Sequence, residues 1–327
     1  MPQPLIDSFG RVHRDLRISV TDRCNFRCTY CMPEEGMPWV PRDEILTFEE
    51  ITRLARVAVE RFGVDSIRVT GGEPTVRAHL PVLVERLAAL EVDLSMTTNG
   101  ATLRSMARDL RAAGLQRVNI SLDSLQRDRF IELTRRDELD HVLDGIDAAI
   151  DAGFDPVKVN VVCMDGVNDG EIVDFATFGR ERGVEVRFIE FMPLDGGHTW
   201  KRATVVPGER IVHTINAVYP LRPLARAHEP AARWEYVDGR GSVGVVPSVT
   251  EPFCATCDRV RLTAEGRMRA CLFSLEETDL RALLRSGASD DVLASAMAAC
   301  VAGKWAGHGI GTVTFVQPPR SMSQIGG

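Results

Sequence analysis

Six short runs rich in β-branched residues alternate with amphipathic helical stretches along the first part of this 327-residue chain. The predicted strands are LRISV (16–20), SIRVT (66–70), VDLSMTT (92–98), RVNISL (117–122), VKVNVV (157–162) and VEVRFIEFM (184–192). Strands and helices that alternate in this way form a parallel sheet, and right-handed crossovers curve it towards a barrel. Six repeats fall short of the eight that close a barrel, so we expect an α/β fold with a partial β/α6 TIM-type barrel.

The helical stretches carry their own boundary signals. Thr47 and Glu50 form a capping-box pattern ahead of an apolar stripe, and Gly63 stands where that helix should end. The repeat stops after residue 193, where stretches rich in proline and glycine begin. We therefore predict a barrel core over residues 1–193, and a smaller irregular C-terminal region over 194–327 that closes the barrel.

Each predicted strand has one apolar and one polar face. The polar faces comprise Arg17, Ser19, Arg68, Thr70, Ser95, Thr97, Asn119, Ser121, Lys158 and Asn160. Helices must cover the apolar faces, so the polar faces should line the lumen. Buried cations need partners, so Arg17, Arg68 and Lys158 predict a large anionic ligand there. In the alternative interpretation they pair with acids such as Glu190 and merely build a polar core.

Six of the eight cysteines fall into two tight groups. The first group is Cys24, Cys28 and Cys31, a C-x3-C-x2-C pattern in the loop after the first predicted strand. Three thiolates from one loop can hold three irons of a 4Fe–4S cluster and leave the fourth iron open. A zinc knuckle is the alternative, but zinc prefers four protein ligands, and the sequence offers no further Cys or His near this loop.

The second group is Cys254, Cys257 and Cys271, which again supplies three thiolates. Here the zinc alternative would recruit His308 or Cys300 as a distant fourth ligand. Arg259 and Arg261 follow Cys257 closely, and their guanidinium groups could bind phosphate beside an open iron. The chain ends in two glycines, 326 and 327, which we expect to thread into a narrow site because glycine needs no side-chain room.

These motifs together resemble the radical S-adenosylmethionine (SAM) superfamily, and within it the GTP 3',8-cyclase family of molybdenum cofactor biosynthesis. The resemblance runs from about residue 5 to 327 and rests on LRISVTDRCNFRCTYCMP, IRVTGGEP, MTTNG, VNISLDS, KVNVV, FIEFMPL, FCATCDRVRLTAEG and the terminal GG. It implies two 4Fe–4S clusters, ligated by Cys24, Cys28 and Cys31 and by Cys254, Cys257 and Cys271. It implies SAM contacts at Tyr30, Gly72, Ser121 and Met192. It implies GTP contacts at Arg17, Arg68, Thr97, Lys158, Arg259, Val260 and Arg261, with Arg17 and Tyr30 as catalytic residues.

The same resemblance implies a lyase-type enzyme that uses a 5'-deoxyadenosyl radical to convert GTP to 3',8-cyclo-7,8-dihydro-GTP. Its partners would be an electron donor such as flavodoxin or ferredoxin and the downstream cyclic pyranopterin monophosphate synthase, and a homodimer is left open. Two alternatives remain: another radical SAM enzyme with an auxiliary cluster, such as a peptide-modifying maturase, and a non-catalytic electron-transfer module.

Composition narrows the classes of partner. The net charge of −7 argues against nonspecific binding to nucleic acid or anionic membrane. No run of 18 apolar residues occurs, so we expect no membrane span and a cytoplasmic location.

Overall fold

The computed structural model describes residues 2–195, 197, 200–225 and 229–326. The strands are β1 (Asp15–Ser19), β2 (Ser66–Thr70), β3 (Asp93–Thr98), β4 (Arg117–Ser121), β5 (Val157–Cys163), β6 (Glu185–Glu190), β7 (Leu221–Pro223), β8 (Ala232–Tyr236), β9 (Ser242–Val246), β10 (Arg259–Leu262), β11 (Arg267–Arg269) and β12 (Thr278–Asp279). Over the described residues these twelve strands form one sheet, in the spatial order β12-β11-β10-β1-β2-β3-β4-β5-β6-β9-β8-β7.

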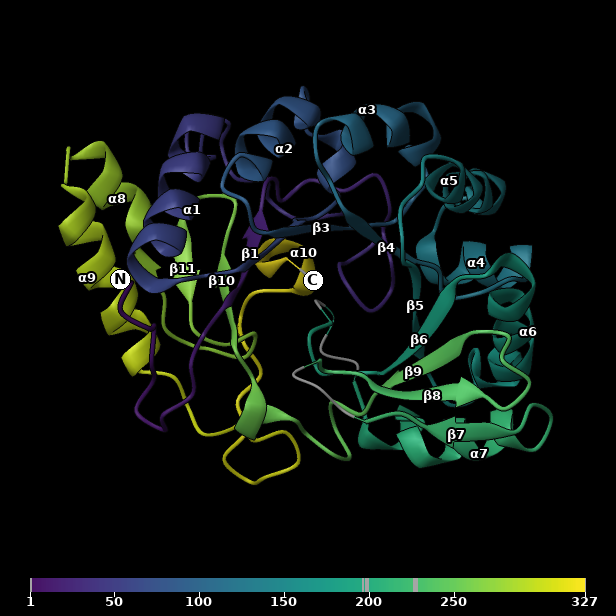
Figure 1. Ribbon diagram of the computed structural model, residues 1–327. Coiled ribbons are helices and arrows are strands. Elements are labelled where there is room, and N and C mark those ends of the chain that lie inside the picture. The colour runs from purple at the N-terminus through teal and green to yellow at the C-terminus, as the bar shows by residue number, and fades with distance from the viewer. Residues whose placement is uncertain (1, 196, 198–199, 226–228, 327) are drawn as a thin grey trace.

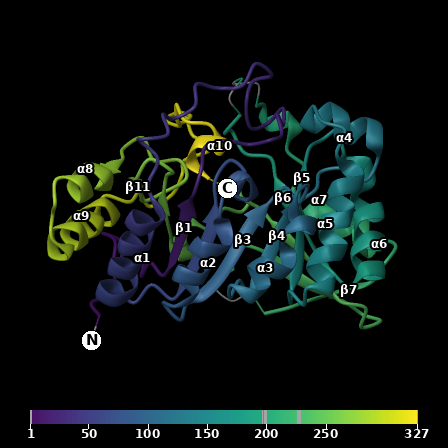
Figure 2. The same ribbon diagram turned by 90° about the horizontal axis from the view of Figure 1, so that it is seen from above.

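The helices lie on the outside of the curved sheet (Figure 1). They are α1 (Phe48–Phe62), α2 (Leu80–Ala88), α3 (Ala107–Ala112), α4 (Arg127–Thr134), α5 (Leu139–Asp151), α6 (Ile172–Arg182), α7 (Gly208–Asn216), α8 (Leu280–Arg285), α9 (Asp290–Ala302) and α10 (Met322–Ile325). The exception is α10, a single turn that lies inside the ring of strands, next to the C-terminus (Figures 1 and 2). The C-terminal segment therefore returns to the lumen.

The six predicted strands are confirmed as β1 to β6, all paired in parallel. The sheet then continues at both edges, because β10 adds in parallel to β1 and β9 adds in parallel to β6. Beyond these two strands, β11 and β8 run antiparallel, and the described residues do not close the sheet into a barrel. The predicted partial barrel is thus confirmed, but the C-terminal region also extends its sheet.

The local signals explain why the core elements form where they do. Thr47 and Glu50 make the reciprocal hydrogen bonds of a capping box at the start of α1, and Gly63 ends that helix with left-handed backbone. The apolar stripe of α1 includes Ile51 and Leu54, which are fully buried against the strands. The apolar layer between sheet and helices leaves the other face of the sheet free for polar side chains.

Cys254 and Cys257 lie in the second cysteine loop, between β9 and β10, the strands that add to the two edges of the parallel sheet, and Cys271 follows β11. Because β10 runs parallel to β1 beside it, the loop that leads into β10 lies at the opposite end of the strands from the loop that follows β1. No helix among the described residues is long and apolar enough to cross a membrane. The division of the chain at residues 193 and 194 stays a prediction.

Candidate active site

The first cysteine loop leaves β1 and is fixed by the end of α4. Backbone N–H groups of Arg27 and Thr29 donate to the carbonyls of Thr134 and Leu133. Phe26, inside the C-x3-C motif, is buried and packs edge-to-face on Phe130 of α4. The loop is therefore held in place by the end of a helix.

The three thiols of this loop are free and partly buried. Burial raises the pKa of Cys24 to about 12 and that of Cys31 to about 11, and it raises the pKa of Cys28 well above its usual range. Neighbouring thiols add to the shift at Cys28, since Cys31 and Cys24 lie close enough to oppose its ionisation. A backbone N–H of Phe26 donates to Cys24 Sγ at 3.3 Å. Iron would have to displace these protons, and such a set of adjacent free thiols suits a cluster.

The GGEP turn after β2 rests directly on this loop. Gly72 N–H donates to the Thr21 carbonyl at 2.7 Å. A Cβ on Gly72 would lie 2.4 Å from the Arg23 carbonyl oxygen, so only glycine fits. Glu73, the third residue of the motif, is buried and accepts hydrogen bonds from Thr75, Thr98 and Asn99. The turn thus fixes the loop through backbone contact.

Strand register builds a row of arginines on the lumen face. Arg17 lies opposite Arg68 on β2 and opposite Arg261 on β10. Burial, and then the neighbouring Arg68, lower the pKa of Arg17, whose Nε makes no hydrogen bond within the described chain and lies 3.7 Å from Asp15 Oδ2. Burial and Arg259 lower the pKa of Arg261 to about 9. These side chains carry more positive charge than their surroundings neutralise.

Glu190, the acid that we considered as a partner for these cations, forms its hydrogen bonds with other groups. Glu190 is fully buried and accepts hydrogen bonds from Gly208, Val249 and Thr250. Other carboxylates take part instead: Asp15 lies near Arg17, and Glu185 and Glu229 lie near Lys158. The polar-core interpretation is thus right that some of the lumen cations lie near carboxylates. It is wrong that Glu190 is one of those carboxylates.

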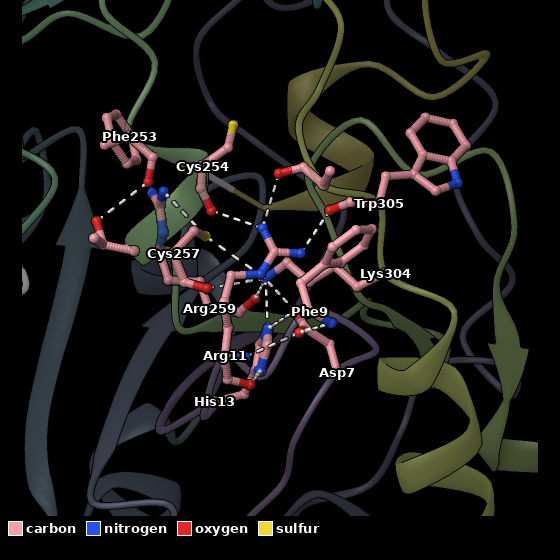
Figure 3. A network of polar contacts seen from close by, with 12 residues as sticks. Asp7, Phe9, Arg11, His13, Phe253, Cys254, Cys257, Arg259, Lys304 and Trp305 are labelled. Atoms are coloured by element: carbon pink, nitrogen blue, oxygen red, sulfur yellow. Dashed lines mark hydrogen bonds and ion pairs between the residues drawn. The ribbon is translucent and has the colours of Figure 1, made fainter.

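The second cysteine loop is surrounded by cations. Burial raises the pKa of Cys257, but Arg259 and Lys304 outweigh it and lower the value to about 7. Arg259 Nη2 donates to Cys257 Sγ at 3.5 Å, and Lys304 Nζ donates to the same sulfur at 3.6 Å. The Cys254 carbonyl accepts from Arg11 Nη1 at 2.7 Å (Figure 3). Positive side chains around free thiols favour the thiolate form that iron requires.

The zinc alternatives find no support in this geometry. Among the described residues, no three His, Cys, Asp or Glu side chains form a set that could hold a metal ion. His308 uses both ring nitrogens on backbone groups, at the Ser248 carbonyl and the Ile310 N–H. Cys300 Sγ donates to the Met268 carbonyl. Cysteines of a 4Fe–4S cluster bind separate irons and need not converge on one point.

One cavity is lined both by Tyr30 of the first cysteine loop and by the three cysteines of the second group. Its lining within the described residues includes Arg17, Tyr30, Arg68, Thr97, Asn119, Ser121, Asp123, Asn160, Arg187, Met192, Cys254, Cys257, Arg259, Arg261, Cys271 and Met322. Five arginines and a single carboxylate, Asp123, are among the described residues that line this cavity. Its chemistry is that of a site for a polyanion, with the free thiols of the second group and Tyr30 of the first cysteine loop in its wall.

Comparison with known proteins agrees with this arrangement. Residues 18–179 match the family model for the radical SAM superfamily, and residues 184–310 match that for Molybdenum Cofactor Synthesis C. A protein of Streptomyces coelicolor named GTP 3',8-cyclase is 52% identical, over 99% of this chain and 96% of its own length. This chain belongs to the GTP 3',8-cyclase family of radical SAM proteins. A Rhodopirellula baltica GTP 3',8-cyclase is 48% identical over all of this chain and 93% of its own length.

Solved structures of two proteins with bound S-adenosylmethionine share the fold of this GTP 3',8-cyclase family member. Streptococcus suis SuiB bound to S-adenosylmethionine has a TM-score of 0.61 at 16% identity, covering 86% of this chain and 67% of that chain. The protein anSMEcpe with bound AdoMet has a TM-score of 0.58 at 17% identity, covering 81% and 77%. At this level of identity the likeness shows the architecture alone.

The structure brings most of the predicted site residues of this family member together. Arg17, Arg68, Thr97, Ser121, Tyr30, Met192, Arg259 and Arg261 all line the cavity, as do Cys254, Cys257 and Cys271. Within the described chain, the lining does not include Cys24, Cys28, Cys31 and Gly72. Lys158 is buried on the lumen face but outside the cavity lining, and burial and then Arg187 lower its pKa to about 8. The Val260 side chain lies in the apolar core, so only its backbone is available to a ligand. Their roles stay predictions.

Several residues of the site were not identified from the sequence. Tyr30 OH donates to Asp123 Oδ2 at 2.5 Å, and burial raises the pKa of Asp123 to about 6. Strand parity could have found Arg187, which lies opposite Asn160 in the register of β5 and β6. Lys304 carried only one signal, since it is one of three lysines in the chain.

Proposed function

We propose that this chain is a GTP 3',8-cyclase, which converts GTP to 3',8-cyclo-7,8-dihydro-GTP in molybdenum cofactor biosynthesis. The observation that carries the proposal is a cavity lined, within the described chain, by five arginines, by Tyr30 of the first cysteine loop and by the three cysteines of the second group. Full-length relatedness to proteins of that name supports it.

The cysteine loops hold the two cofactors of this proposal. Cys24, Cys28 and Cys31 would ligate one 4Fe–4S cluster, and Cys254, Cys257 and Cys271 would ligate the other. When bound, the clusters supply the electron that cleaves SAM and an open iron for the guanine base. Tyr30, Ser121 and Met192 line the cavity on the side of the first loop, where they would contact SAM.

The lumen arginines hold and orient the nucleotide. Arg17, Arg68 and Arg261 stand side by side on three strands, and their mutual repulsion is relieved by a triphosphate. Closing a bond between ribose C3' and guanine C8 needs both ends of GTP fixed in one geometry. Holding reacting groups in this way can contribute roughly 7–11 kcal/mol to lowering a barrier.

The partners follow from this reaction. SAM cleavage consumes electrons, so we assign the chain a reduced flavodoxin or ferredoxin as donor. Its cyclised nucleotide is then the substrate of cyclic pyranopterin monophosphate synthase. Both GTP and SAM are cytoplasmic metabolites, so the reaction belongs in the cytoplasm.

The test is product formation by the full chain, loaded anaerobically with iron and sulfide, from GTP, SAM and dithionite. We expect Cys28→Ala to abolish 5'-deoxyadenosine formation, and Cys257→Ala to keep uncoupled SAM cleavage but lose the cyclised nucleotide. Cys300→Ala, outside both groups, is the control and should retain both activities. If the loaded wild type forms no product from GTP, the proposal fails, and turnover of a peptide instead would favour a maturase.

A further inference from the structure

A buried lysine far from the second cysteine loop in sequence donates to one of its sulfur atoms. Lys304 lies just beyond α9 and its side chain is buried. Its Nζ lies 2.8 Å from His13 Nε2 and 2.8 Å from the Arg259 carbonyl oxygen, and it lies 3.5 Å from the carbonyl oxygen and 3.6 Å from the Sγ of Cys257. An ammonium has three N–H donors: His13 and the Arg259 carbonyl take two, and the carbonyl oxygen and the sulfur of Cys257 share the third (Figure 3).

His13 fixes this ammonium through its own tautomer. His13 Nδ1 lies 3.0 Å from the Arg11 carbonyl oxygen, which can only accept a hydrogen bond, so Nδ1 carries the ring proton. Nε2 is then an acceptor for Lys304. Since the His13 side chain is fully buried, water does not compete for this contact. The lysine is thereby aimed at the sulfur.

The segment that carries His13 is itself tied to the cysteine loop. Arg11 forms an ion pair with Asp7 at 2.5 Å, and its guanidinium donates to the carbonyls of Cys254, Trp305 and Ala306. The N-terminal segment therefore bridges the second cysteine loop and the chain around Lys304, as Figure 3 shows.

We propose that Lys304, anchored by His13 and the Arg259 carbonyl, is a positioning residue that raises the reduction potential of the cluster held by Cys254, Cys257 and Cys271. This rests on the proposed function, which places a cluster there. Reduction adds negative charge to a cluster, and a cation that donates to a ligand sulfur stabilises the reduced form more than the oxidised form. Lys304 tunes the cluster and is not required to hold it.

The test is an EPR-monitored redox titration of the anaerobically loaded full chain. The Cys24→Ala/Cys28→Ala/Cys31→Ala background isolates the signal of the second cluster. We expect Lys304→Met to lower the midpoint potential, so that the oxidised-to-reduced ratio at the wild-type midpoint rises about tenfold, equivalent to about 59 mV for one electron. Lys201→Met removes the same charge from an exposed side chain and should leave the midpoint unchanged.

A second pair of variants keeps the test decisive if Lys304→Met does not fold. His13→Leu removes the acceptor that anchors the ammonium and should lower the midpoint, whereas His13→Gln keeps an acceptor and should shift it less. Equal midpoints in all variants would overturn the proposal, as would loss of the second cluster from a folded Lys304→Met chain. A wild type that assembles a second cluster but makes no product from GTP would instead overturn the proposed function.

Discussion

At the scale of single residues, the site depends on close backbone packing as much as on its cysteines. A Cβ added at Gly72 would collide with the carbonyl oxygens of Asp22 and Arg23 in the segment that leads into the first cysteine loop. The motif therefore needs glycine for a reason internal to the protein, in addition to any contact with SAM. A substitution there should act on the loop first.

We expect Gly72→Ala to lower the iron content and the thermal stability of the loaded protein. The added Cβ would lie 2.4 Å from the Arg23 carbonyl oxygen, and forcing such a contact apart costs about 1–3 kcal/mol. Gly170→Ala is the matched control, because a Cβ at Gly170 meets nothing within 4 Å. Iron content and melting temperature of the two variants check this, and equal values would contradict it.

Substitution of Arg17 tests whether the positive charge of the lumen binds the nucleotide. We expect Arg17→Gln to weaken GTP binding by roughly 10- to 100-fold, because a charged hydrogen bond is worth about 1.5–3 kcal/mol. Arg14→Gln alters an exposed arginine three residues away and should leave binding unchanged. Equilibrium binding of GTP to the loaded chain without SAM measures the difference. An unchanged dissociation constant in a folded Arg17→Gln chain would exclude Arg17 from the nucleotide site.

At the scale of elements, alternation and parity predicted the part of the site that lies on β1 to β5. Arg17, Arg68 and Ser121 were placed on the lumen face because side-chain direction in a strand follows a period of two. The same rule could not place Lys304, whose partner His13 is 291 positions away and follows no periodic pattern. Contacts between loops depend on tertiary packing, which a local pattern does not encode.

The strands that extend the sheet were missed for a related reason. The sequence SVGVV (242–246) is short and follows a glycine-rich turn, and RVRL (259–262) lies between Cys257 and Cys271 of the second cysteine group. Both strands gain their stability by pairing with β6 and β1, which are distant in sequence. Arg259 and Arg261 therefore reach the lumen through a strand that only the tertiary fold defines.

The capping box of α1 allows a test of how much one helix end contributes to stability. Thr47 Oγ1 accepts from Glu50 N–H at 3.2 Å, and Glu50 Oε2 accepts from Thr47 N–H at 2.8 Å. We expect Thr47→Ala to lower the free energy of unfolding by about 1 kcal/mol, with little change in turnover. Thr214→Ala, in the interior of α7, is the control and should cost less. Chemical denaturation measures both.

At the scale of the whole molecule, the C-terminal tail joins the two halves of the site. Ile325 is buried in a cluster with Leu194 and Phe273, which anchors the tail before its last residues. The Ile325 carbonyl accepts from Ser19 Oγ on β1, and the Gly326 carbonyl accepts from Arg261 on β10. The predicted threading into a narrow site agrees with the position of Gly326, while Gly327 lies outside the described residues.

Removing Gly326 and Gly327 should therefore impair turnover far more than folding. The deletion leaves the buried Ile325 side chain in place, but frees Arg261 from the carbonyl that orients it over the lumen. We expect at least a tenfold loss in the rate of product formation, equivalent to about 1.4 kcal/mol, with the melting temperature nearly unchanged. Ile325→Ala should instead lower the melting temperature, because emptying a core position costs about 2–5 kcal/mol of stability. If the truncated chain turned over GTP at the wild-type rate, Arg261 would not depend on the tail for its orientation, and the lumen alone would hold the nucleotide.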